Sequence, residues 1–162
     1  MNDTPETSQA EMPPLRVNGQ YIKDLSLEIP SAPQIFLDMQ GQTPEIPIHV
    51  DVDATAVGPN MFEVVLHLRA EAKLPTKSLF ILELDYAGLF TVNVPEEQVH
   101  PVLLIECPRL LFPFARQIVA DLTREGGFPP LMLQPLDFVS LYRQRMEEMA
   151  AEQESAEGQP KH

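Results

Sequence analysis

The sequence lacks features that mark several large classes of proteins. Among its 162 residues it has one cysteine and no tryptophan, and 11 Lys and Arg stand against 24 Asp and Glu, for a formal net charge of −13. A single cysteine cannot close an intrachain disulfide, which excludes a secreted, disulfide-stapled scaffold. The negative charge opposes binding to the phosphates of nucleic acids and to anionic membrane surfaces.

Long apolar runs are missing as well. No run approaches the roughly 20 residues that a transmembrane helix needs. The first residues of the chain lack both the basic and the apolar region of a signal peptide. Because 44% of the residues are hydrophobic, the chain can still build a core. We therefore expect a cytoplasmic protein that neither inserts into membranes nor binds nucleic acid.

The two ends of the chain differ in composition from its middle. Residues 1–19 are polar and contain three prolines, and residues 147–162 hold five Glu and one Lys with almost no large apolar side chain. Neither segment can bury enough apolar area to offset the entropy lost on ordering. We predict a disordered polar tail at 1–19, one folded domain at 20–146 and an acidic flexible tail at 147–162.

Alternation of apolar and polar residues with a period of two predicts four strands in the first half of the chain. They are expected at residues 21–29, 46–55, 61–73 and 77–86. A long irregular segment, residues 30–44, separates the first strand from the second. The connections between the last three strands are short, which requires antiparallel pairing.

The second half of the chain changes to a helical period, after a short helix or irregular segment at residues 95–105. A helix within residues 108–125 carries a wide apolar stripe, ends at Gly126 and Gly127, and is expected to kink or start late at Pro113. Asp137 is the predicted N-cap of a last helix over residues 138–149. Strands followed by helices predict an α+β fold, in which helices cover one face of a four-stranded antiparallel sheet.

If the strands pack their apolar sides on the helices, their other sides form one exposed face. The alternation places eight acids and three bases on this surface, which we call the acidic face: Asp24, Glu28, Asp51, Asp53, Glu63, Glu71, Glu83 and Asp85, with Arg69, Lys73 and Lys77. The same alternation puts Tyr21 and Lys23 on the apolar side. The acidic face is either a solvated surface that keeps the protein soluble or a docking surface for a basic or metal-bearing partner.

Signatures of catalysis and metal binding are missing from the sequence. There is no HExxH, CxxC, GxGxxG, Walker or GxSxG motif, and the four histidines show no paired spacing. Cys107 precedes Pro108 at a helix start, where a thiolate could be favoured, but it has no partner in a recognised nucleophile motif. We expect no enzymatic activity, no cofactor and no metal held by the chain itself.

The helix predicted at 108–125 offers more apolar surface than one sheet face can cover. Two adjacent apolar rows run along residues 110–122, and surplus apolar surface usually indicates self-association. The residues expected at an interface between copies are Leu110, Leu111, Phe114, Ile118 and Leu122.

Several stretches of the chain resemble the SecB family of bacterial protein-export chaperones. CPRLLFPFAR (107–116) and GFPPLMLQPLDF (127–138) resemble its C-terminal half, and YIKDLSLEIPSAP (21–33) resembles its first strand and the crossover loop after it. FEVVL (62–66) and LELDYAGLF (82–90) resemble its third and fourth strands. The resemblance covers about residues 20–146, and departs from the commonest pattern near 40–43 and 95–101.

The resemblance implies a homotetramer, a dimer of dimers, that holds precursor proteins unfolded without ATP and passes them to the SecA motor ATPase. It implies that a basic, zinc-bearing tail of SecA docks at Asp24, Glu28 and Glu83, with the zinc belonging to the partner. It also implies that unfolded clients bind apolar grooves between the crossover loop and the last helix. The residues nominated for client binding are Ile35, Phe36, Phe138, Leu141 and Tyr142.

Other functions stay open on the sequence alone. A non-chaperone adaptor would use the acidic face for one folded partner and would have no client groove. A SecB-like holdase can also serve a circuit other than export, such as toxin–antitoxin control. An enzyme would rest only on scattered carboxylates and Cys107.

Overall fold

Four long strands form one antiparallel sheet in the computed structural model, which describes residues 12–158. The strands are β1 (Leu15–Glu28), β2 (Ile48–Gly58), β3 (Met61–Lys73) and β4 (Ser78–Val92). Their order across the sheet is β1-β4-β3-β2, with every neighbouring pair antiparallel. The last three strands are therefore the predicted meander, and β1 pairs with the free side of β4.

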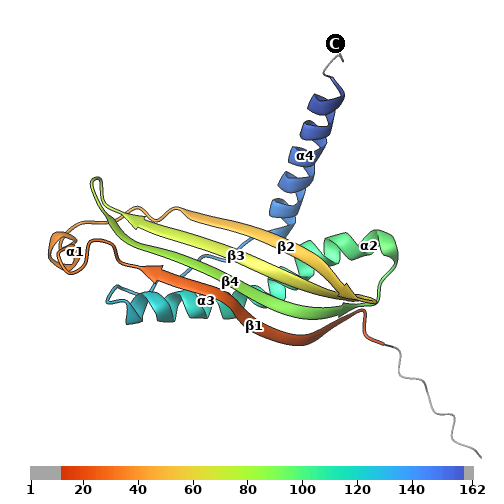
Figure 1. Cartoon of the computed structure of the whole chain (residues 1–162), viewed down its shortest axis with the longest axis horizontal. Helices are drawn as coiled ribbons and strands as arrows, with labels where there is room; N and C mark the ends of the chain where they lie inside the picture. Colours follow the sequence, from red (N-terminus) through yellow and green to blue (C-terminus); the bar gives the residue numbers. More distant parts are fainter. Residues whose placement is uncertain (1–11, 159–162) are drawn as a thin grey trace, which may run out of the picture.

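The helices follow the strands in the chain, which confirms the predicted α+β class. A short helix, α1 (Ile35–Asp38), interrupts the crossover segment expected to be irregular. After the sheet come α2 (Glu96–Pro101), a π-helical segment η1 (Val102–Glu106), α3 (Cys107–Glu125) and α4 (Phe138–Glu157). Figure 1 shows α3 lying along one face of the sheet, whereas α4 projects away from it.

Within residues 12–158, no helix is long and apolar enough to cross a membrane.

The core lies between α3 and the sheet. Leu84 and Phe90 of β4 and Leu111 of α3 are all 0% exposed. Gly88 allows this close packing, because a Cβ atom there would lie 2.5 Å from a ring carbon of Phe90 and 3.0 Å from a methyl carbon of Leu111. The absence of a side chain at Gly88 thus lets Phe90 and α3 pack directly over β4.

The end of α3 is set by the predicted glycine pair. Gly127 has a φ of +91°; its N–H donates to the Arg124 carbonyl at 3.0 Å, and the N–H of Phe128 donates to the Thr123 carbonyl at 3.1 Å. This pair of bonds is a Schellman motif. The buried Thr123 hydroxyl also accepts the N–H of Leu131 at 2.9 Å, which fastens the segment after the helix.

The start of α3 corrects one prediction. The helix begins at Cys107 and continues through Pro113, so a late start at Pro113 is wrong. Pro108 lies in the first turn, where a missing N–H costs no internal hydrogen bond. Buried Leu111, Phe112 and Ala115 hold both sides of Pro113 against the core, which compensates for the hydrogen bond that this proline cannot make.

The folded part of the chain extends beyond both predicted boundaries. β1 begins at Leu15, which pairs with Val92, so residues 15–19 of the expected N-terminal tail belong to the sheet. α4 continues to Glu157, because Ala, Glu and Gln dominate residues 147–157 and are strong helix formers. The remaining residues of the two predicted tails, 1–11 and 159–162, lie outside the described residues.

Candidate docking face and apolar hollows

The three residues predicted to contact SecA lie on adjacent strands. In the register of β1 and β4, Asp24 stands opposite Asp85, Ser26 opposite Glu83, and Glu28 opposite Ile81. Since side chains two residues apart point to the same side of a sheet, Asp24, Glu28 and Glu83 share one face. That face is opposite to the one that buries Leu82 and Leu84 against the helices.

The alternation of side chains between the two faces of the sheet is shifted in β1 at Lys23. Ile22 pairs with Tyr86 and Asp24 pairs with Asp85, so Lys23 has no counterpart on β4, as in a β-bulge. The bulge shifts the alternation by one residue, and the prediction that Tyr21 and Lys23 lie on the apolar side is wrong. The Tyr21 hydroxyl donates to Glu63 on the acidic face, and Lys23 Nζ lies 2.6 Å from the same carboxylate.

Cations from β3 occupy one side of the acidic face. Arg69 Nε lies 3.1 Å from Glu83 Oε1, and Arg69 Nη1 lies 3.4 Å from Glu71. His67 stands between two carboxylates, with Nδ1 at 2.6 Å from Asp85 and Nε2 at 2.8 Å from Asp53. Lys77, predicted for this face, instead pairs with Asp38 of α1.

The β1 side of the acidic face is less neutralised. Within residues 12–158, neither Asp24 nor Glu28 takes part in a salt bridge. Both side chains belong to exposed residues. The unpaired negative charge of this face is therefore concentrated at β1, beside Glu83.

His67 gives the acidic face a group that titrates near neutral pH. Partial burial lowers the pKa of His67, but the hydrogen bonds and charges of Asp85 and Asp53 outweigh it, so that the pKa is raised above its ordinary value of 6.5. The folded state thus favours the imidazolium. This stabilisation is complete below the ordinary pKa and is lost as the pH rises through the raised pKa.

We predict that His67→Gln lowers the free energy of unfolding more at about pH 6 than at about pH 9. The difference between the two pH values should be at most about 1 kcal/mol, because the imidazole is partly exposed and its ion pairs are screened. Urea unfolding of the wild type and the variant at both pH values measures it. A destabilisation that grows with pH would contradict the assignment.

One arginine fastens α4 to the edge of the sheet. Arg145 donates a hydrogen bond to the Val52 carbonyl of the edge strand β2. Its Nη atoms also lie 3.7 Å from Asp51 and 3.8 Å from Asp53. The helical period indicates only that Arg145 shares a side of the helix with Leu141, and nothing local in the sequence reveals these partners.

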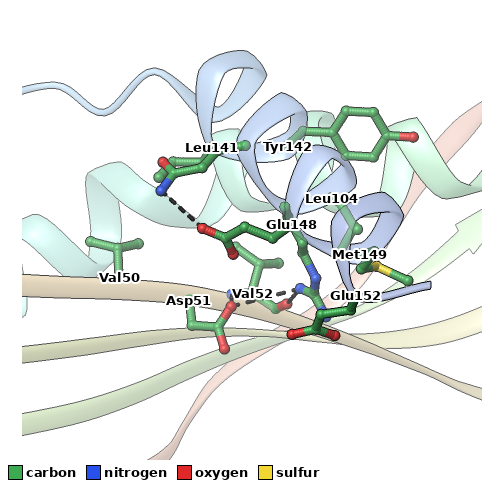
Figure 2. Close-up of a pocket in the computed structure, with 11 residues that line it drawn as sticks. Val50, Asp51, Val52, Leu104, Leu141, Tyr142, Glu148, Met149 and Glu152 are labelled. Carbon is green, nitrogen blue, oxygen red and sulfur yellow. Dashed lines mark hydrogen bonds and ion pairs between the residues drawn. The ribbon is translucent and has the colours of Figure 1, made fainter. Parts of the chain in front are cut away.

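The first hollow lies between α4 and β2, has a volume of about 420 Å³, and is drawn in Figure 2. Its lining mixes apolar with charged side chains: Val50, Asp51, Val52, Leu104, Leu141, Tyr142, Gln144, Arg145, Glu148, Met149 and Glu152. Leu141 and Tyr142, nominated for client binding, are among them. Phe138 is not; it is 2% exposed and packs edge-on against Phe112, with ring centroids 6.1 Å apart.

The second hollow lies beside the crossover segment, and its volume is about 400 Å³. It is mainly apolar, and its lining residues are Met39, Gln42, Thr43, Pro44, Ile46, Leu79, Phe80, Phe128, Pro129, Pro130 and Leu131. Phe36, nominated for client binding, stacks on Phe128 at 5.3 Å between ring centroids and thereby supports this wall.

The five nominated client residues do not form one groove. Ile35 is 0% exposed and Phe138 2%, so neither can contact a client in this structure, and that part of the nomination is corrected. No residue lines both hollows. The sequence analysis did not nominate Pro129, Pro130 and Leu131 in the wall of the second hollow, for which the apolar, proline-rich stretch after Gly127 was the available signal.

The five predicted interface residues of α3 also differ in how much of each is exposed to solvent. Leu110 is 42% exposed and Phe114 52%, whereas Leu111 is 0% exposed in the core. Ile118 and Leu122 are half-buried. The exposed part of the stripe is therefore centred on Leu110 and Phe114.

Cys107 does not have the environment of a nucleophile. It is 0% exposed, and burial, followed by the charge of Glu106, raises the pKa of the thiol to about 12. The thiol is therefore protonated at neutral pH. In the described part of the chain, no group of three or more His, Cys, Asp or Glu is arranged to hold a metal ion.

Comparison with known proteins gives consistent matches to one family. Residues 8–149 match the family model described as SecB, preprotein translocase subunit SecB. The Protein-export protein SecB of Paramagnetospirillum magneticum is 68% identical over 93% of this chain and 97% of its own length. The Protein-export protein SecB of Rhodospirillum rubrum is 58% identical over 96% of each chain.

A solved structure supports the fold independently. It is a SecB-like chaperone of Mycobacterium tuberculosis in complex with a peptide from an antitoxin. Its TM-score is 0.59 at 22% sequence identity, over 76% of this chain and 91% of the other. At this identity the likeness shows the fold alone.

Proposed function

The chain belongs to the SecB family, and we propose that it works in the cytoplasm as a homotetrameric holdase that keeps precursors unfolded and delivers them to SecA. It is a chaperone of preprotein export. The observation that carries this conclusion is the identity, over nearly the whole chain, to relatives named Protein-export protein SecB. Tetramer, client sites and SecA docking are the parts that experiment must test.

The two hollows are the proposed client sites. Each has a volume of about 400 Å³; the walls of the second are mainly apolar, and those of the first combine apolar and charged side chains. Both suit an extended, unfolded segment, which presents apolar side chains together with main-chain polar groups. Leu141 and Tyr142 represent the first hollow, and the partly exposed Met39, Ile46 and Leu131 represent the second. Weak binding at each site is enough, because several sites on one oligomer raise the overall affinity.

The acidic face is the proposed SecA site. Asp24 and Glu28 offer carboxylates without a salt bridge in the described structure, and Glu83 stands on the neighbouring strand. A basic tail that carries its own zinc complements this surface without requiring a metal ligand from the chain. Because the attraction is between exposed charges, the affinity should fall as salt is added.

The alternative functions have less support. The match to a SecB-like chaperone with an antitoxin peptide is at 22% identity, far below the export relatives. An adaptor without client binding gives no role to the two hollows, of which the second is mainly apolar. An enzyme finds no support at Cys107, whose thiol is buried and protonated.

The holdase proposal is tested by the aggregation of a chemically unfolded precursor after dilution from denaturant. We expect the full chain to suppress light scattering at one tetramer per precursor, without ATP. Two unrelated unfolded proteins should also be protected, whereas the same proteins in their folded state should not bind. Absence of suppression at this ratio would refute the holdase, and binding of SecA alone would then favour the adaptor.

A further inference from the structure

Glu83 is the only one of the three proposed SecA contacts that forms a salt bridge within residues 12–158. Arg69 of β3 stands directly opposite Glu83 of β4 in the register of the two strands. Its Nε donates to Glu83 Oε1 at 3.1 Å. A cationic partner that reaches Asp24, Glu28 and Glu83 therefore meets two available carboxylates and one that an arginine already occupies.

Arg69 has a second carboxylate that can keep it paired after it leaves Glu83. Its Nη1 lies 3.4 Å from Glu71, whose side chain is 19% exposed and also accepts the hydroxyl of Ser78 at 2.8 Å. Glu71 is therefore held in place by β4 independently of Arg69. Displacing Arg69 from Glu83 consequently leaves no unpaired guanidinium on the sheet.

There is also room for this exchange. Glu83 is 57% exposed and Arg69 43%, so a partner can reach the carboxylate from solvent. Arg69 and Glu83 both border a shallow hollow of about 200 Å³ on the β2 side, together with His49, Asp51 and His67. This hollow gives a partner's cation space beside the ion pair of Arg69 and Glu83.

We propose that Arg69 is a built-in competitor for Glu83, and that it sets which cationic partners the acidic face accepts. The inference rests on the proposed docking of SecA at this face. Binding at Glu83 replaces one ion pair by another, so a partner with a single cation gains little there. A partner with several cations also engages Asp24 and Glu28, and this gain is not cancelled. Arg69 thereby selects a multiply charged basic tail over isolated lysines and arginines.

Calorimetry on the full chain tests this, with the zinc-loaded C-terminal tail peptide of SecA as the probe at low salt. Arg69→Gln should bind the peptide about two- to fivefold more tightly than the wild type, as expected for loss of one exposed competing ion pair. The matched control is Lys73→Gln, which removes the same charge from the same strand; among the described residues, Lys73 Nζ forms a salt bridge with Glu71 alone, at 3.8 Å. In a Glu83→Gln background, Arg69→Gln should gain no more than Lys73→Gln.

The outcomes separate this inference from the function on which it rests. Equal gains from Arg69→Gln and Lys73→Gln, or weaker binding by Arg69→Gln, would overturn the role of Arg69 and leave the docking site intact. A wild-type chain that fails to bind the peptide would overturn the docking and the role of Arg69 together. A gain from Arg69→Gln that persists without Glu83 would show that the competition is not for this carboxylate.

Discussion

Leu111→Ala is expected to lower the free energy of unfolding by about 2 to 5 kcal/mol, the range for leucines truncated in a rigid core. Leu111 is 0% exposed and packs over Gly88. Because Phe90 and the backbone of β4 are held by the sheet, they cannot collapse to fill the space that the leucine leaves. Urea unfolding followed by circular dichroism measures the loss.

The control for this prediction is Gln117→Ala on the same helix. Gln117 is exposed, and its side chain donates a hydrogen bond to Asp121 of the same helix, so its replacement should change the stability by about 0.5 kcal/mol at most. An unfolding curve of Leu111→Ala that matches the wild type, combined with a loss of oligomer, would show that Leu111 is an interface side chain after all.

Leu110→Asp combined with Phe114→Asp is expected to break the proposed tetramer into smaller species that remain folded. The two side chains are 42% and 52% exposed in the isolated chain. They lie four residues apart and therefore on one side of α3. A carboxylate buried at an interface without a partner costs several kcal/mol, and a symmetric assembly meets that cost in every copy.

Light scattering at micromolar concentration, with circular dichroism as the check on folding, decides this prediction. Gln98→Asp adds the same kind of charge to an exposed residue of α2 instead of α3, and should leave the mass unchanged. A wild-type monomer at this concentration, or a double variant that stays tetrameric, would refute the interface centred on Leu110 and Phe114.

Local patterns in the sequence were sufficient for the four strands and the two long helices in their order, but not for α1. The period of two located all four strands, and the glycine pair at 126–127 and Asp137 marked a helix end and a helix start that the structure confirms. These signals are local, since each depends on residues within one turn or one strand. The α+β class follows from them because the sheet and the helices have one apolar side each.

The bulge at Lys23 shows where local patterns fail. An extra residue in β1 reverses which side chains face the core, and only the pairing with β4 reveals it. Asp24 stays on the acidic face, whereas Tyr21 moves to it and binds Glu63. Pairing across the sheet is a long-range property that alternation within one strand does not contain.

The sequence pattern also does not predict how deeply each apolar side chain is buried. The helical period placed Leu110 and Leu111 in one apolar stripe, yet one is 42% exposed and the other fully buried. For the same reason the pattern could not show that two of the five nominated client residues, Ile35 and Phe138, lie inside the core. Periodicity indicates the direction of a side chain, whereas its burial depends on what packs against it.

The contact between α4 and β2 likewise depends on tertiary structure. Arg145 contacts Val52, Asp51 and Asp53 of β2. Val52 lies 93 residues earlier in the chain. This contact brings the helix that lines one hollow to the carboxylates at the edge of the acidic face. Residues proposed for client binding and residues of the acidic face thus lie on separate but neighbouring parts of the molecule.

Clients and SecA are proposed to use different surfaces of the chain, and one pull-down from cytoplasm distinguishes the two. The baits are the wild type, Asp24→Asn with Glu83→Gln, and Glu96→Gln with Glu97→Gln, a control that removes two exposed charges from α2. We predict that all three retain signal-bearing precursors, while the variant at Asp24 and Glu83 alone loses SecA. Equal recovery of SecA with all three baits, or loss of precursors together with SecA, would contradict the account.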